Sequence, residues 1–168
     1  ALILLNDDDL TYAQIRLDET SLATLVSGIQ KLDSSLSRAL CWGAAWDMCR
    51  DAELHPSDFV TLVLSGVGVE TDLTAVQGVL AQARTTIDQY APRNTRADLN
   101  DRFVSGLAHL LKEAEPGSDH QLAFARALVS AARSDAVVQV LQAWLAGEEA
   151  PAGLAIDLRH EGIGSLAR

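Results

Sequence analysis

The first seventeen residues show a pattern of apolar and polar positions that predicts a β-hairpin. Four apolar residues (2–5) meet a polar turn (6–9), and an alternating segment then runs to Leu17. Asn and Asp favour such turns because their side chains bond the local backbone and tolerate positive φ. A lone two-stranded hairpin is only marginally stable in water. We therefore expect residues 1–17 to be a β-hairpin remnant of a preceding β-sandwich domain.

From Asp18 onward the hydrophobic period changes from two residues to about 3.6, which predicts helices. Capping and breaking residues divide this pattern into separate helices. Ser57 is expected to cap a short helix that stops at Gly66, and Pro92 to end the next one. The expected helices cover approximately residues 18–32, 34–52, 57–66, 72–90, 95–113, 118–132, 135–147 and 157–168.

Short loops between these helices favour antiparallel neighbours, in a bundle or in a stack of helical hairpins. We expect a mainly α fold, with antiparallel helical hairpins in a curved HEAT/armadillo-like stack and a short N-terminal β-hairpin. The helix over residues 35–52 is apolar on two sides, so we expect it to be the central element. Residues 18–168 form the expected α-helical domain, truncated at its end.

The composition predicts a globular chain whose core is made of Leu, Ala and Val. Of the 168 residues, 48% are apolar and only 5% are aromatic. The net charge is -10, and the 11 Arg and 2 Lys are scattered, so we expect no nucleic-acid partner. No apolar run reaches the roughly 20 residues of a transmembrane helix, so we expect no membrane partner.

Cys41 and Cys49 are expected to be reduced. Eight positions along one helix separate them by about 12 Å, whereas a disulfide needs Cα atoms within about 7 Å. Reduced thiols, and an N-terminus without the basic region of a signal peptide, predict a cytoplasmic location. Because the only methionine is Met48, we expect the chain to be a processed product or an excised piece.

None of the four histidines has the neighbours that a metal site needs. The segment HEGIG at His160 begins like the zinc-peptidase motif HExxH, but Gly164 stands where the second His is required. His55, His109 and His120 lack partners at the spacing of metal ligands. We therefore expect no catalytic, cofactor-binding or metal-binding residue in this chain.

Two further motifs have simpler explanations than ligand binding. Asp7, Asp8 and Asp9 lack the glycine and the distal glutamate of an EF-hand, so they are interpreted as turn residues. The sequence Gly66-Val67-Gly68 follows a helix and has no lysine after it, unlike a phosphate-binding loop.

Trp42 and Trp46 lie four residues apart and therefore near one another on a helix surface. Aromatic residues at this spacing are usually buried, so we favour core packing. An interface with a neighbouring domain and a binding platform are the alternatives. Together with Asp47 and Arg50, these tryptophans are the candidate core or domain-interface residues.

Two stretches resemble bacterial aminopeptidase N. LLNDDDLTYAQIRLDE (residues 4–19) is similar to the strand–turn–strand that closes the β-sandwich of that family, and RALCWGAAWDMCRDAEL (residues 38–54) to the helix that follows. ETDLTAVQGVLAQA (residues 70–83) fits the next part. Near the end, His160 stands where the family has a tryptophan after Leu-Arg.

The resemblance implies that the chain is the C-terminal helical region of a zinc aminopeptidase, similar to the C-terminal domain of endoplasmic-reticulum aminopeptidases. In this family the region encloses the active-site chamber and limits which peptides reach the zinc. The implied partners are the upstream catalytic and β-sandwich domains and the peptide substrate. The zinc motif of the family matches nothing here, so zinc is expected only in the parent enzyme and the chain alone is expected to be inactive. The alternative is an independent helical-repeat scaffold that binds a protein partner.

Overall fold

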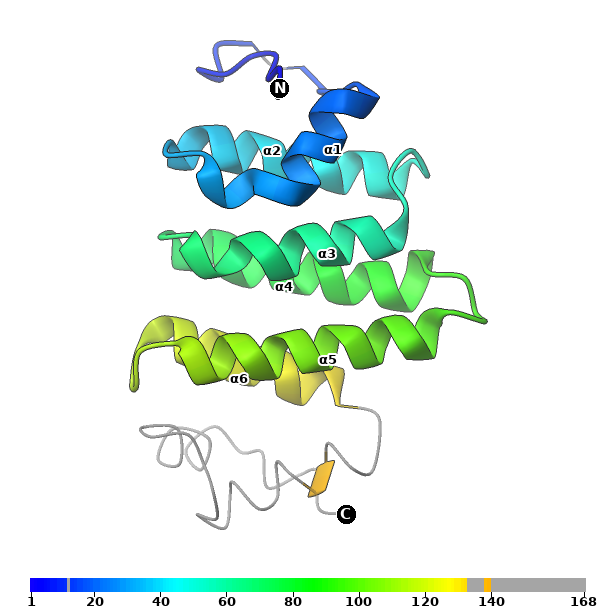
Figure 1. The fold of residues 1–168 in the computed structure, drawn as a ribbon, viewed down its shortest axis with the longest axis vertical. Helices are drawn as coiled ribbons and strands as arrows, with labels where there is room; N and C mark the ends of the chain where they lie inside the picture. Colours follow the sequence, from blue (N-terminus) through cyan, green and yellow to red (C-terminus); the bar gives the residue numbers. More distant parts are fainter. Residues whose placement is uncertain (12, 133–137, 140–168) are drawn as a thin grey trace. The chain divides into compact units, whose positions relative to one another are not determined.

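The computed structural model describes residues 1–11, 13–132 and 138–139, and the chain divides into two compact units, residues 1–103 and 104–168 (Figure 1). Its described part is mainly α, as predicted. In chain order the elements are α1 (Glu19–Gly28), η1 (Ile29–Lys31), α2 (Ser35–Arg50), α3 (Pro56–Gly66), η2 (Val67–Val69), α4 (Leu73–Thr85), η3 (Thr86–Tyr90), α5 (Arg96–Glu113) and α6 (Asp119–Ala131).

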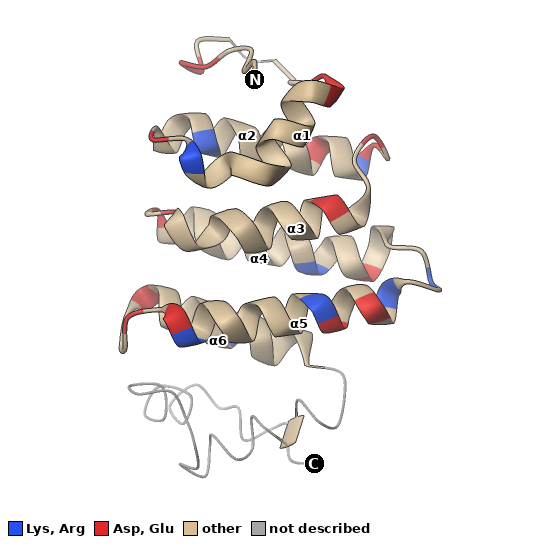
Figure 2. Cartoon of the chain, viewed as in Figure 1, with Lys and Arg blue, Asp and Glu red and all other residues tan. Residues whose placement is uncertain are grey.

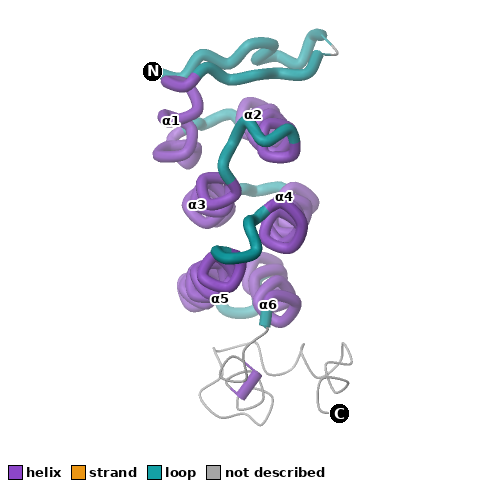
Figure 3. Tube along the Cα trace, turned by 90° about the vertical axis from the view of Figure 1, so that its right-hand side faces the viewer, coloured by secondary structure: helices purple, strands orange, loops and turns teal. Residues whose placement is uncertain are grey.

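In the first unit, successive helices alternate between two sides. Figure 3 shows α1 and α3 on one side and α2 and α4 on the other. The chain runs in opposite directions along α2, α3 and α4, so that neighbours form helical hairpins (Figure 1). α3 packs against α1, α2 and α4. The central helix is therefore α3, and not the helix over residues 35–52 that the sequence pattern favoured.

Side chains that cap the first turn fix where these helices begin. Asp18 caps α1, and Asp72 caps α4, within the predicted starts. The prediction that Ser57 caps α3 was wrong. The cap is His55, whose Nδ1 accepts a hydrogen bond from the Ser57 N–H at 3.2 Å. Pro56 fills the first helical position, where its missing N–H costs nothing and its fixed φ suits the helix, so the cap must precede it.

The C-terminus of α2 ends in a Schellman-type cap with an alanine in the left-handed position. Ala52 has φ 63°. Its N–H donates to the Cys49 carbonyl at 3.2 Å, and the Glu53 N–H donates to the Met48 carbonyl at 2.8 Å. This position usually holds glycine, which lacks the Cβ that makes positive φ costly. The cap reverses the chain between α2 and α3.

The predicted N-terminal β-hairpin is not confirmed: the described residues of 1–17 contain no strand. A turn is present over residues 5–8, where Asn and Asp predicted one. The Asp9 N–H donates to the Asn6 carbonyl at 2.8 Å and closes it, and the Asn6 side chain adds two hydrogen bonds to Thr11. Its Oδ1 accepts from the Thr11 N–H at 2.9 Å, and its Nδ2 donates to the Thr11 carbonyl at 2.6 Å. Without further strands, pairing of two short arms contributes little stability.

The last residues of this N-terminal segment are attached to the helices of the first unit. Ile15 and Leu17 are buried, and Arg16 forms ion pairs with Asp51 and Glu53 in the loop that follows α2. The domain boundary between residues 17 and 18 stays a prediction. The segment also carries exposed apolar side chains, of which Leu10 is 86% exposed: Ile3, Leu5 and Leu10.

The second unit is described over the later part of α5 and over α6. Gly117 has φ 77°, which suits a residue without Cβ. Its N–H donates to Gln121 Oε1 at 2.9 Å. Ser118 caps α6, close to the start of the helix predicted over residues 118–132. The further helices expected over residues 135–147 and 157–168 lie outside the described residues, apart from the helical pair 138–139.

Candidate functional site

A buried ion pair joins α2 to the loop before α4 in the first unit. Arg38 Nε lies 3.1 Å from Glu70 Oε2, and the two side chains are only 7% and 3% exposed. Arg38 Nη2 also donates to Glu70 Oε1 at 3.2 Å, which makes the pair bidentate. The Trp42 indole N–H donates to the same carboxylate at 3.3 Å. These contacts satisfy the charges that α2 and the loop before α4 bury.

The state of Glu70 follows from these contacts. Burial raises the pKa of Glu70, but the hydrogen bonds from Arg38, the Thr71 N–H and Trp42, together with the Arg38 charge, outweigh it and hold the pKa below its usual value. The carboxylate is therefore ionised at neutral pH and saturated with donors. Such a group holds loops together and is not available to act as a general base.

Trp46 is half-buried and forms part of an aromatic surface. Its inner side packs against the buried Phe59, with ring centroids 5.7 Å apart. Tyr90 meets it edge-on at 6.0 Å with an interplanar angle of 77°, and Tyr90 is 38% exposed. Edge-to-face pairs of this kind are favourable because the positive ring edge faces the negative ring face. Trp46 thus contacts the core through Phe59 and leaves part of its ring exposed to solvent.

Two charged residues of α2 accompany this aromatic pair. Arg50 Nη1 lies 3.4 Å from Asp47 Oδ1, one helical turn away. The Arg50 guanidinium carbon lies 6.0 Å from the centroid of the Trp46 ring, at the outer limit of a cation–π contact. We name the set Trp46, Asp47, Arg50 and Tyr90 the Trp46 surface.

The π-helical turn η3 determines where Tyr90 lies. The Ala91 N–H donates to the Thr86 carbonyl at 2.9 Å, the five-residue spacing of a π turn. Such turns add one residue to a helix and redirect the side chains that follow, and they occur often at functional sites. Tyr90, the last residue of η3, is thereby placed beside Trp46 of α2.

A shallow pocket of about 250 Å³ lies between the start of α3 and the start of α5. Its walls are mostly apolar, and Asp98 and Arg102 of α5 contribute charge. The N–H groups at the start of α3 already donate to His55, so they offer no free donors to an anion. The lining residues are His55, Pro56, Ser57, Pro92, Thr95, Asp98, Leu99 and Arg102.

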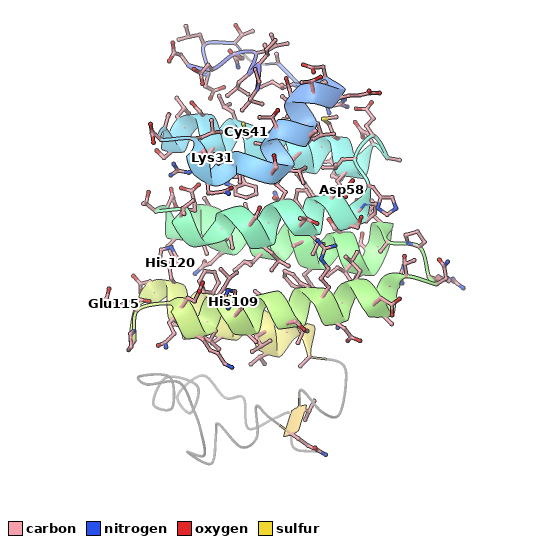
Figure 4. The ribbon with its side chains drawn as sticks, viewed as in Figure 1. Lys31, Cys41, Asp58, His109, Glu115 and His120 are labelled. Carbon is pink, nitrogen blue, oxygen red and sulfur yellow. The ribbon has the colours of Figure 1, made fainter. Side chains whose placement is uncertain are left out.

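The titratable side chains of the described residues form no cluster of three or more that could hold a metal ion. Figure 4 shows Cys41, Asp58 and His109 on three different helices. Both cysteines are free and buried. Burial and the charge of Asp7 raise the pKa of Cys41 to about 11, so its thiol stays protonated and poorly nucleophilic. The segment at His160 lies outside the described residues.

The charged residues of the first unit are dispersed over its helices (Figure 2). α2 carries residues of both signs, Arg84 is the single charged residue of α4, and the start of α5 carries both signs again, so basic residues do not form a continuous stripe there. Among the described residues, no helix is both long and apolar enough to cross a bilayer.

The structure separates the four residues that the sequence singled out. Trp42 belongs to the core, as favoured, whereas Trp46 is shared between core and surface, and Asp47 and Arg50 lie at the surface. Sequence reasoning missed Arg38 and Glu70, and it missed Tyr90. The sequence does hold one signal for the ion pair: Arg38 is a charged residue within an apolar helix pattern, and such a residue indicates a buried partner of opposite charge.

The described residues therefore define a helical domain whose candidate site is a surface and a shallow pocket. In a comparison with known proteins, residues 2–168 match the family described as the ERAP1-like C-terminal domain. The chain is also 48% identical, over 157 residues, to an aminopeptidase N from Streptomyces lividans. This alignment covers 94% of the chain but only 18% of the length of that relative. The chain belongs to the ERAP1-like C-terminal domain family, and the two matches together identify a C-terminal domain of an aminopeptidase.

Proposed function

We propose that this chain is the part of a zinc aminopeptidase that encloses the active-site chamber and helps to control which peptides enter it. The match of residues 2–168 to the ERAP1-like C-terminal domain family carries the proposal. The parent enzyme removes N-terminal residues from peptides, and it acts in the cytoplasm. Its zinc ligands lie in an upstream catalytic domain, so this chain supplies no chemistry.

The alternating helices of the first unit support this role. A stack of helical hairpins, curved as in HEAT or armadillo proteins, presents side chains from many helices along one face. Such a face excludes peptides that do not fit and holds the part of a peptide that extends beyond the catalytic pocket. The contribution to catalysis is therefore positioning and gating.

The N-terminal segment supports the presence of an upstream domain. Ile3, Leu5 and Leu10 are exposed although they are apolar. We propose that residues 1–17 complete a β-sandwich that precedes the helices, where these side chains find an apolar partner. Pairing with that sheet supplies the further strands that a short two-stranded hairpin needs to be stable.

The experiment uses the aminopeptidase N of Streptomyces lividans in three forms: intact, lacking the region aligned with residues 18–168, and with that region replaced by the same residues of this chain. The measurement is kcat/KM for an aminoacyl-anilide and for a peptide. A small anilide needs only the catalytic pocket, whereas a peptide also uses contacts along its length.

Deletion should lower peptide cleavage more than anilide cleavage, and the replacement should restore the ratio. Melting curves check that each form is folded, because deletion exposes an apolar interface. A folded deletion variant with an unchanged peptide-to-anilide ratio would contradict the proposal, and an independent protein-binding scaffold would then explain the domain better.

A further inference from the structure

The outer face of the Trp46 ring already holds a cation from its own chain. The Arg50 guanidinium carbon lies 6.0 Å from the ring centroid, and Asp47 holds the same guanidinium at 3.4 Å. The Asp47 and Arg50 side chains are 31% and 47% exposed. An exposed ion pair one helical turn apart contributes little stability. Another cation can therefore replace Arg50 at low cost.

Tyr90 supplies a second aromatic wall at the same place. It meets Trp46 at 77°, and the two rings come from different elements, η3 and α2. Phe59 packs against Trp46 from within the core, so the indole cannot turn away from the surface easily. Two aromatic rings at a steep angle, with a carboxylate beside them, are the components of sites that recognise cationic groups.

We propose that Trp46, Tyr90 and Asp47 form a subsite for a cationic side chain, arginine or lysine, of a bound peptide. Arg50 occupies the subsite when no peptide is bound. The incoming cation takes the place of Arg50 over the indole and pairs with Asp47. The net charge of -10 adds a long-range attraction for cationic peptides. The proposal rests on the proposed function for its choice of peptides as the ligand.

The chemistry of the surface decides between ligand classes. Asp47 repels an anionic side chain, and an aliphatic side chain has no use for the carboxylate. A cationic side chain satisfies both the carboxylate and the ring faces. We therefore expect the subsite to bind arginine more tightly than citrulline, which has nearly the same shape but no charge.

The test measures binding of two peptides to the 168-residue chain, N-acetyl-Gly-Ala-Arg-Ala-Gly-amide and the same peptide with citrulline in place of arginine. The readout is the NMR signal of the Trp46 indole N–H, assigned with Trp46→Phe. We expect the arginine peptide to shift this signal and to bind about five-fold more tightly than the citrulline peptide, as a cation–π contact of ordinary strength predicts.

Four variants make the assignment specific. Arg50→Gln removes the internal competitor and should raise affinity for the arginine peptide by about two- to five-fold. Asp47→Asn and Tyr90→Ala should lower that affinity. Arg93→Gln removes an equal charge from a loop outside the Trp46 surface, and should leave the preference for arginine over citrulline unchanged.

Equal binding of the two peptides would overturn the inference, and so would an Arg50→Gln variant that binds the arginine peptide no more tightly than the wild type. Either result leaves the proposed function standing, because that function is tested separately by the peptide-to-anilide ratio of the aminopeptidase.

Discussion

Arg38 and Glu70 are 32 residues apart in the sequence and form a bidentate ion pair in the interior of the first unit. Arg38 Nη1 also donates to the carbonyl oxygens of Leu32, at 2.7 Å, and Asp33, at 3.1 Å. One guanidinium therefore ties the loop before α2 to the loop before α4. We regard this side chain as the main polar connection within the first unit.

We expect Glu70→Gln to lower the free energy of unfolding by about 3–5 kcal/mol, because it leaves the buried Arg38 charge without its counter-ion. Urea denaturation measures the loss. Glu53→Gln is the matched control: Glu53 is 47% exposed and pairs with Arg16 at the surface, so its loss should cost no more than about 1 kcal/mol. If the two variants were equally stable, the pair would not hold the unit together.

Acid should remove the same stabilisation. The pKa of Glu70 in the folded chain lies below its usual 4.5, so the unfolded chain takes up the proton first as the pH falls. The contribution of Glu70 is therefore present above about pH 4.5 and lost progressively below it. The free energy of unfolding should be measured for the wild type and for Glu70→Gln at a series of pH values. We expect the difference between the two free energies to become smaller below about pH 4.5. A difference that stays constant with pH would contradict the depressed pKa.

Gly66 should not tolerate alanine. A Cβ at this position would meet Ile29 Cγ2 and would lie 2.9 Å from Trp42 Cη2, too close for either contact. Overpacking of this kind costs about 1–3 kcal/mol. Gly43→Ala and Gly78→Ala are the controls, because a Cβ there has nothing within 4 Å. They should stabilise their helices by about 0.5–1 kcal/mol. The measurement is the Tm of each variant. If the Tm of all three variants were higher than that of the wild type, or all three lower, the result would contradict this packing.

Ala52→Gly should stabilise the chain. Alanine at φ 63° carries a penalty of about 1–2 kcal/mol, whereas glycine loses about 0.4–1 kcal/mol through the greater freedom of the unfolded chain. The expected net gain is on the order of 0.5–1 kcal/mol. Ala39→Gly, at an exposed position inside α2, should instead cost about 1 kcal/mol. A loss of stability in both variants would show that residue 52 does not adopt the left-handed conformation.

Local signals in the sequence were enough to predict most of the helices. Helix starts follow from capping side chains such as Asp18, Ser34 and Asp72, which act within three residues of themselves. The cap of α3 was harder to predict, because Ser57 is also a good capping residue and only Pro56 at the first helical position requires the cap to precede it. The predicted strands are not confirmed in the described residues, and they are harder to predict because a sheet depends on partners that lie far away in the sequence.

The candidate site was only partly predictable. The spacing of Trp42 and Trp46 indicated a shared aromatic face, but it could not show that one ring is buried and the other half-exposed. Nor could it show the second ring of this surface, Tyr90, which η3 brings next to Trp46 from 44 positions away in the sequence. Tertiary contacts of this kind leave no periodic signal in a single sequence.

The proposal that this domain controls peptide access is tested most directly by the dependence of kcat/KM on peptide length. The measurement uses a series of peptides from two to about ten residues that share one N-terminal residue, with the intact aminopeptidase N of Streptomyces lividans and with its variant lacking the region aligned with residues 18–168. We predict that kcat/KM varies with length in the intact enzyme and that this variation flattens in the folded variant, since contacts beyond the catalytic pocket are lost. Identical length profiles in the two proteins would contradict the account.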